Sequence, residues 1–171
     1  MPADYSWIAH TTSESAAQRV DGAWLARLGF LLFGFGVIWL AALKPRTWGR
    51  WATVLHTSFG IFMLAAAVFS ARPWDVALPY DPIENILHSV AATAMGFSFA
   101  FGVVAIVLRR ANNDLPFCWL DAAAIAASVV LPVGMLLATD IAGALQRGIF
   151  LVAYAWYARE TVLVWRREAP Q

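Results

Sequence analysis

The sequence predicts an all-α membrane protein, a polytopic helix bundle of about five transmembrane helices with the N-terminus outside and the C-terminus inside. Three observations lead to this fold class. Hydrophobic residues make up 61% of the 171 residues and charged residues 13%, against roughly 45–50% and about 25% in an average soluble domain. The apolar residues form five runs, each long enough to cross a bilayer. Basic residues gather in alternate connections between these runs.

The first three predicted spans are apolar runs separated by short polar segments. The first span covers about 22–43 and ends at a basic turn over 44–50. The second covers about 51–71, and the third covers about 83–108, where two arginines stop it. Soluble proteins seldom repeat helices of this length with so few charges between them, so these runs indicate a membrane bundle.

The last two predicted spans complete the bundle. The fourth covers about 115–138, and Pro132 predicts a kink in its later part because proline removes a helical hydrogen-bond donor. The fifth covers about 141–165 and is closed by two arginines. We therefore expect residues 22–171 to form a single transmembrane domain, preceded by an extracytoplasmic N-terminal arm over residues 1–21.

The orientation follows from the basic residues. Sorting the connections by alternate sides places seven of them together: Lys44, Arg46, Arg50, Arg109, Arg110, Arg166 and Arg167. The positive-inside rule makes that side cytoplasmic. The net charge is only +1 and no basic stripe is present, so nothing indicates a nucleic-acid partner.

Small residues four apart predict close packing between the third and fourth spans. The pairs are Ala92 with Gly96, Ser98 with Gly102, and Ala122 with Ala126. Helices bearing such pairs can bring their backbones together without a side chain intervening.

A set of polar residues gathers at the outer ends of the first, third and fifth spans and in the arm. Its members are His10, Glu14, Arg27, Glu84, His88, Asp140, Gln146 and Arg147. Ionisable groups inside a bilayer are costly, so each of these is a functional candidate. In one interpretation the two arginines pair with the carboxylates and fix how the helices and the arm dock. In another the arginines bind an anionic or polar lipid head group.

A third interpretation of this outer cluster is a metal site. His10 and Glu14 are four residues apart, and so are Glu84 and His88, so each pair would share one helix face. Two imidazoles and two carboxylates suit a metal such as zinc. No HExxH motif and no cysteine cluster accompanies them in the sequence.

His56 lies about one turn inside the second span, on the opposite side from the outer cluster. An isolated transmembrane histidine can ligate the metal of a haem or another pigment. The alternative is a histidine that forms a hydrogen bond between helices.

The fifth span carries further polar groups. We expect Arg159, near its inner end, to form an ion pair with Asp121 of the fourth span. Tyr154, Trp156 and Tyr157 need hydrogen-bond partners inside the bundle or in a cavity, and they indicate an internal binding space.

Four segments, taken together, resemble a bacterial membrane family catalogued as domain of unknown function 998: Tyr5–Glu14, Trp24–Phe30, His88–Ala92 and Leu145–Arg147. Members of that family usually carry a further apolar helix ahead of the Ser-Glu segment, which this chain is expected to lack. The resemblance implies a multi-pass protein of the bacterial cytoplasmic (inner) membrane in which four residues act together: Glu14, Arg27, His88 and Arg147. It implies no activity.

No nucleophile elbow, phosphate-binding glycine loop or nucleophile with a nearby base is present in the sequence. We therefore predict a non-catalytic integral membrane protein, either an accessory subunit of a larger membrane complex or a lipid-binding helical bundle. The alternatives are a membrane-embedded metal-dependent hydrolase acting on lipid at the outer leaflet and a small transporter. Membrane lipids and other membrane subunits are the expected partners, and no cofactor is predicted beyond the metal and pigment alternatives above.

Overall fold

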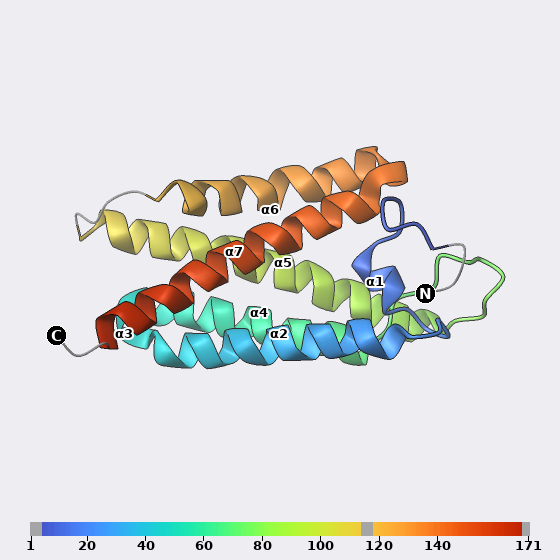
Figure 1. Ribbon diagram of the computed structural model, residues 1–171, viewed down its shortest axis with the longest axis horizontal. Coiled ribbons are helices and arrows are strands. Elements are labelled where there is room, and N and C mark those ends of the chain that lie inside the picture. The colour runs from blue at the N-terminus through green and yellow to red at the C-terminus, as the bar shows by residue number, and fades with distance from the viewer. Residues whose placement is uncertain (1–4, 114–117, 169–171) are drawn as a thin grey trace.

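A computed structural model describes residues 5–113 and 118–168 of the chain, with side chains up to residue 163. The described residues form seven α-helices and one 3-10 helix (Figure 1). Their bounds are α1 Thr12–Ser15, α2 Ala23–Leu43, α3 Pro45–Trp48, α4 Arg50–Val68, α5 Pro82–Ala111, α6 Trp119–Leu137, η1 Thr139–Ile141 and α7 Ala142–Glu168.

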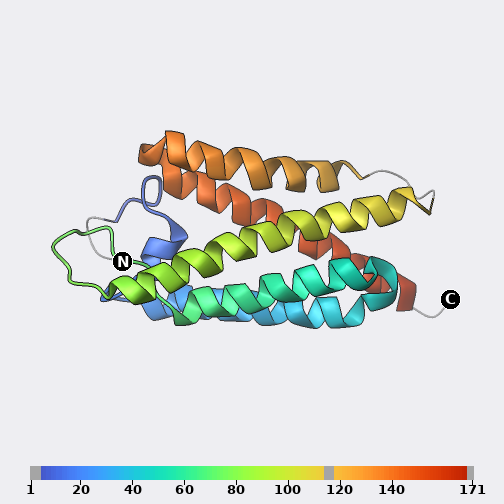
Figure 2. The ribbon, with the colours of Figure 1, turned by 180° about the vertical axis from the view of Figure 1, so that it is seen from behind.

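The five long helices run lengthwise along the molecule and alternate in direction, and α7 crosses obliquely between α6 and α2, as both views show (Figures 1 and 2). Helix α4 packs between α2 and α5, while α6 packs on α7 and on α5. Two ends result. The arm end holds residues 5–22, the connection over residues 69–81 and η1, and the basic end holds α3 and the C-terminal ends of α5 and α7.

Four helices are long and apolar enough to cross a membrane: α2, α4, α5 and α6. Their outward faces carry large apolar side chains that a soluble protein would bury. Trp39 is 71% exposed, Leu136 81% and Leu137 83%. Contiguous apolar surface of this extent marks contact with lipid or protein, and the chain is a multi-pass helical membrane protein.

Helix α7 differs from the other long helices. It has 27 residues, which is about 40 Å at 1.5 Å per residue and therefore long enough to span a bilayer. It is not among the four apolar spans, because Arg147, Arg159 and Glu160 interrupt its hydrophobic run. The fifth span thus stays a prediction. The predicted start of the fourth span, at residues 115–117, lies outside the described residues, and α6 begins at Trp119.

The second span ends three residues earlier than predicted, because side chains of α5 bind the backbone that follows α4. The carboxylate of Glu84 accepts a hydrogen bond from the Ser70 N–H at 2.7 Å. His88 Nδ1 lies 2.8 Å from the Phe69 carbonyl oxygen and 3.1 Å from that of Ala66. The chain therefore leaves the helix at Phe69, whose backbone is extended. Asp81 caps α5 by accepting from the N–H of Ile83 at 2.8 Å.

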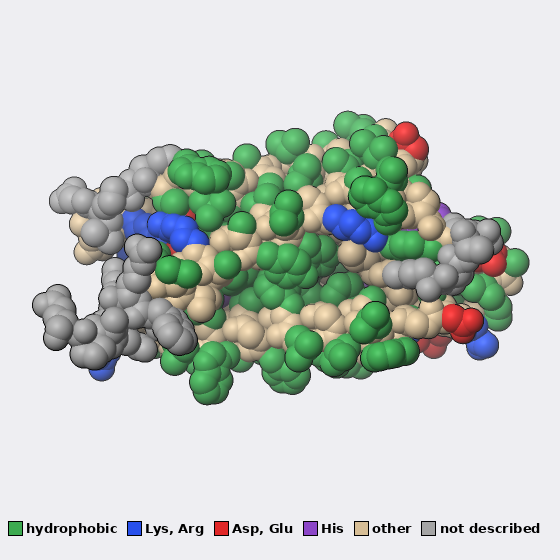
Figure 3. All heavy atoms as spheres, in the orientation of Figure 1, with side chains coloured by type: hydrophobic (Ala, Val, Ile, Leu, Met, Phe, Trp, Pro, Cys, Tyr) green, Lys and Arg blue, Asp and Glu red, His purple; other side chains and the backbone are tan. Residues whose placement is uncertain are grey.

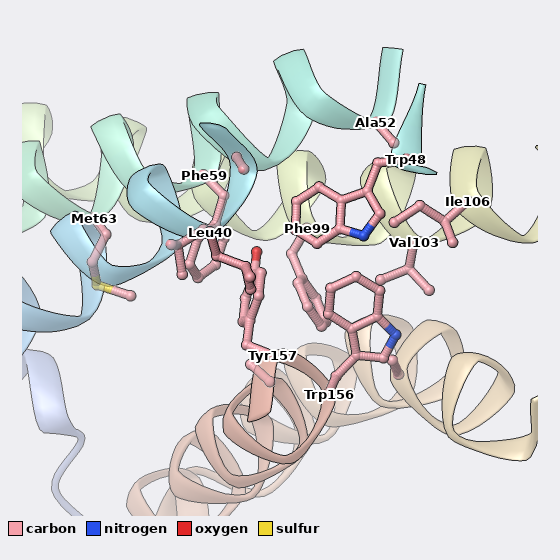
Figure 4. Packing of buried hydrophobic residues seen from close by; sticks show 14 of the residues in the cluster. Leu40, Trp48, Ala52, Phe59, Met63, Phe99, Val103, Ile106, Trp156 and Tyr157 are labelled. Atoms are coloured by element: carbon pink, nitrogen blue, oxygen red, sulfur yellow. The ribbon is translucent and has the colours of Figure 1, made fainter. Parts of the chain in front are cut away.

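Gly102 of α5 packs against α4, and the prediction that these small residues bring α5 and α6 together was wrong for Gly96, Gly102, Ala122 and Ala126. A Cβ on Gly102 would come within 2.8 Å of the His56 imidazole of α4, whereas a Cβ on Gly96 would meet nothing within 4 Å. Ala122 and Ala126 of α6 are exposed. Beside this contact the rings of Trp48, Phe99, Trp156 and Tyr157 fill the core between α4, α5 and α7 (Figure 4).

We predict that Gly102→Ala lowers the stability of the protein by about 1–3 kcal/mol, because the new methyl group overlaps an imidazole that surrounding rings hold in place. Gly96→Ala in the same helix is the matched control and should leave stability unchanged or raise it by up to about 1 kcal/mol. Thermal unfolding of both variants in detergent measures the difference. Equal midpoints for the two variants would contradict the close contact between α4 and α5.

Candidate functional site

Arg147 fixes the N-terminal arm to the start of α7. One terminal nitrogen of its guanidinium donates to the carbonyl oxygens of Trp7 at 2.6 Å, His10 at 2.9 Å and Gly143 at 2.9 Å, and the other donates to the Tyr5 hydroxyl. Gly143 allows the approach, since a Cβ there would overlap the His10 carbonyl. The arm in turn accepts hydrogen bonds from the first N–H groups of α7, which have no partner within the helix.

Two more side chains of the predicted cluster hold the arm. Arg27 of α2 donates to the carbonyl oxygens of Ala16 and Ala17 at 2.9 and 3.0 Å. The Gln146 side-chain oxygen accepts from the Thr12 N–H at 2.7 Å. The arginines of this end therefore bind backbone carbonyls, and the expected pairing with carboxylates is absent among the described residues.

The acids and histidines of the cluster are engaged separately. Glu14 closes a capping box with Thr11, accepting from its N–H at 2.7 Å. The His10 ring stacks on Trp74 at 5.2 Å between centroids. Asp140 is exposed, and Glu84 and His88 bind the backbone after α4. In the part of the chain that the structure describes, no three such side chains are placed to hold a metal ion.

Beside the docked arm an apolar groove of about 490 Å³ opens between α2 and α7. Its apolar lining comes mainly from Phe30, Phe150, Leu151 and Tyr154, and its polar rim comes from Thr12 and Arg147. Figure 3 shows hydrophobic side chains along the hollow between α2 and α7, with Lys or Arg side chains beside it toward each end. Of the three aromatic residues predicted to line an internal space, only Tyr154 lines the groove, and Trp156 and Tyr157 are buried in the core.

The basic end contains a buried ion cluster that the sequence interpretation largely missed. Glu160 and Asp121 are each 1% exposed. Arg110 joins them, donating to Asp121 and, at 2.6 Å, to Glu160. Glu160 also accepts from the indole N–H of Trp48 at 2.8 Å and lies 3.4 Å from the ammonium of Lys44. The cluster therefore ties the ends of five helices, α2, α3, α5, α6 and α7, to two carboxylates.

The predicted pair of Arg159 and Asp121 is present but long, at 3.8 Å, and Arg159 lies closer to Glu160, at 2.9 Å. The partners that were missed are Lys44, Trp48, Arg110 and Trp156, whose indole N–H donates to Asp121 at 2.8 Å. The sequence does indicate the two cations, Lys44 and Arg110. Each lies where an apolar run ends, at about the depth of the two carboxylates along the spans. A carboxylate inside an apolar run requires a cation from a neighbouring helix end.

His56 forms the predicted hydrogen bond between helices, with its Nδ1 2.8 Å from the Tyr157 hydroxyl. Trp156 stacks on the imidazole at 4.9 Å, and Trp48 lies at 4.7 Å. These rings and Gly102 occupy the space around a side chain that is fully buried. A pigment bound at His56 would have to displace them.

A family model described as "Protein of unknown function (DUF998)" matches residues 1–162. The chain belongs to this family. The resemblance drawn from four sequence segments is thereby confirmed. No curated protein and no solved structure matches the chain. Membership of DUF998 identifies a helical membrane protein and assigns no specific role.

For this DUF998 protein we predict that Glu160→Gln lowers the free energy of unfolding by about 3–5 kcal/mol, because the buried Lys44 and the partly buried Arg110 lose their shared carboxylate. Asp140→Asn removes the same charge from an exposed position and should change stability by less than about 0.5 kcal/mol. Unfolding by SDS titration in mixed micelles, followed by circular dichroism, compares the two. A Glu160→Gln variant as stable as Asp140→Asn would show that the ion cluster does not hold the helices together.

Proposed function

We propose that this protein is a non-catalytic, lipid-binding helical bundle of the bacterial cytoplasmic membrane, with five spans, an outer N-terminal arm and an inner C-terminus. The observation that carries the proposal is the groove between α2 and α7. Its volume of about 490 Å³ falls within the roughly 300–1,000 Å³ of small-molecule sites. Its long apolar lining suits an acyl chain.

The groove is lined mainly by apolar side chains and carries few polar groups. Thr12 of the arm, Arg147 of α7 and the Tyr154 hydroxyl are the polar ones, while Phe30, Phe150 and Leu151 supply apolar surface. The apolar lining suits an acyl chain, and Thr12 and Arg147 suit a polar head group. The docked arm supplies the rim, so the contacts of Arg147 with the arm support a role in forming the site.

Five spans and the proposed orientation are supported by the placement of charge. Helix α7 starts at the arm end and runs to the basic end (Figure 1). Five of the basic residues that predict the cytoplasmic side lie together at the basic end: Lys44, Arg46, Arg50, Arg109 and Arg110. An inner basic end agrees with the positive-inside rule.

The two alternative functions find less support. A metal-dependent hydrolase needs His10, Glu14, Glu84 and His88 to converge, and each is engaged with a different part of the backbone or ring system. A transporter needs a polar path through the bundle. Between the depths of His56 on α4 and His88 on α5, the buried face of α4 is apolar and consists of Phe59, Met63 and Ala66.

The topology is tested by single cysteines in a Cys118→Ser background and a membrane-impermeant maleimide. In right-side-out vesicles we expect labelling of Ala77→Cys and Asp140→Cys at the arm end. Asn112→Cys, at the basic end, and a cysteine added after the last residue should react only after the membrane is opened. A C-terminal cysteine labelled from outside would mean that α7 does not cross, and labelling of Asn112→Cys from outside would reverse the orientation.

Lipid binding is tested by filling the groove with Ala144→Phe, since Ala144 lines it. Native mass spectrometry of protein purified in mild detergent should find one phospholipid more on the wild type than on the variant, because the ring takes the place of the chain. Ala126→Phe adds the same bulk to an exposed position of α6 and should keep the lipid. Wild-type protein that holds no lipid, or equal lipid on both variants, would refute the proposed function.

A further inference from the structure

Two adjoining hollows lie at the basic end, away from the groove. The first, of about 250 Å³, is the more polar of the two, and one carboxylate, that of Glu160, lines it together with four cationic side chains: Lys44, Arg46, Arg109 and Arg110. The second, of about 430 Å³ and mainly apolar, lies between α4 and α5. Trp48, Arg109 and Asn113 line both, so the two hollows share a wall.

Among the described residues of this region, cations outnumber carboxylates. The buried cluster and the polar hollow together hold five cations, namely Lys44, Arg46, Arg109, Arg110 and Arg159. The described carboxylates there are two, those of Asp121 and Glu160. The described cations thus exceed the described carboxylates by three, and the polar hollow lies beside them.

Backbone carbonyls orient Arg109, and no carboxylate of the described residues forms an ion pair with it. Its Nε and one terminal nitrogen donate to the carbonyl oxygens of Thr47 and Arg46, both at 3.1 Å. Both acceptors are uncharged carbonyl groups, so these hydrogen bonds do not offset the positive charge of the guanidinium. Gly49 gives it room: a Cβ there would approach a terminal nitrogen to 2.9 Å, and the backbone φ of +79° favours glycine at this position. A planar guanidinium held in this way suits the oxygens of a phosphate group.

We propose that the polar hollow binds the phosphate of an anionic phospholipid whose acyl chain lies in the adjoining apolar hollow. Trp51 and Leu108 line the apolar hollow and are 72% and 59% exposed, so it opens to the lipid phase. A soluble phosphate would use only the polar hollow. Basic pockets between helices at the cytoplasmic face are a recognised form of lipid head-group site. This site requires the helices to span a membrane but does not depend on lipid binding in the groove between α2 and α7.

The experiment uses the full chain carrying Ala144→Phe, so that any lipid counted belongs to the basic end. Native mass spectrometry compares the affinity for phosphatidylglycerol with that for phosphatidylcholine in the same micelles. We expect clear preference for phosphatidylglycerol. Arg46→Gln and Arg109→Gln should each weaken its binding by about fivefold, the contribution of one basic residue near a charged lipid. Arg72→Gln removes an exposed arginine at the arm end and should change nothing.

Arg46 is exposed, so Arg46→Gln tests the site even if Arg109→Gln fails to fold. A parallel titration with inorganic phosphate separates the two sources of the anion. Phosphate that binds wild type and is lost with Arg46→Gln, with no preference between the two lipids, would overturn the lipid assignment in favour of a soluble ligand. Equal lipid affinities together with no phosphate binding would overturn the site itself.

Discussion

The structure depends on the pairing of Asp121 and Glu160 inside a helix bundle that offers them almost no water. A buried carboxylate without a partner costs several kcal/mol, so neither residue can be accommodated unless a cation reaches it. Arg110 contacts both, which draws the C-terminal end of α5 to α6 and α7. Lys44 and Trp48 bring the turn after α2 to the same carboxylate. The spacing of the helices at the basic end therefore follows from two negative charges.

Buried polar groups at the arm end also need hydrogen-bond partners, but there the groups are backbone carbonyls rather than carboxylates. The described part of the arm, residues 5–22, folds back over the bundle with one short helix, so many of its carbonyl groups lack helical partners. Arg27 and Arg147 satisfy them, because a guanidinium has five N–H donors in a fixed plane. Gln18 holds the α4–α5 connection by donating to the Ser70 carbonyl at 3.0 Å and accepting from the Asp81 N–H at 2.6 Å. At the arm end the arginines thus bind backbone carbonyls, whereas at the basic end the cations bind carboxylates.

The hydrophobic pattern was sufficient to predict the long helices, because an apolar run of fixed length has few alternatives in a bilayer. It also placed Arg159 of the fifth span near the depth of Asp121 in the fourth. It could not predict which side chains meet, because depth along a span leaves the rotation of each helix open. Gly102 of α5 therefore lies against His56 of α4, and Arg27 binds backbone carbonyls rather than Glu14. The capping box at Thr11 and Glu14 was readable from local spacing, since it needs no tertiary contact.

The two ends differ in what remains after internal pairing, and this difference bears on function. At the arm end Arg147 is committed to the backbone, and an apolar groove is the feature left open. At the basic end the described cations outnumber the described carboxylates, and a polar hollow lies beside them. An acyl chain is held by apolar area and an anionic head group by unneutralised charge. The same polar residues that dock the helices thus determine which part of a lipid each end is suited to hold.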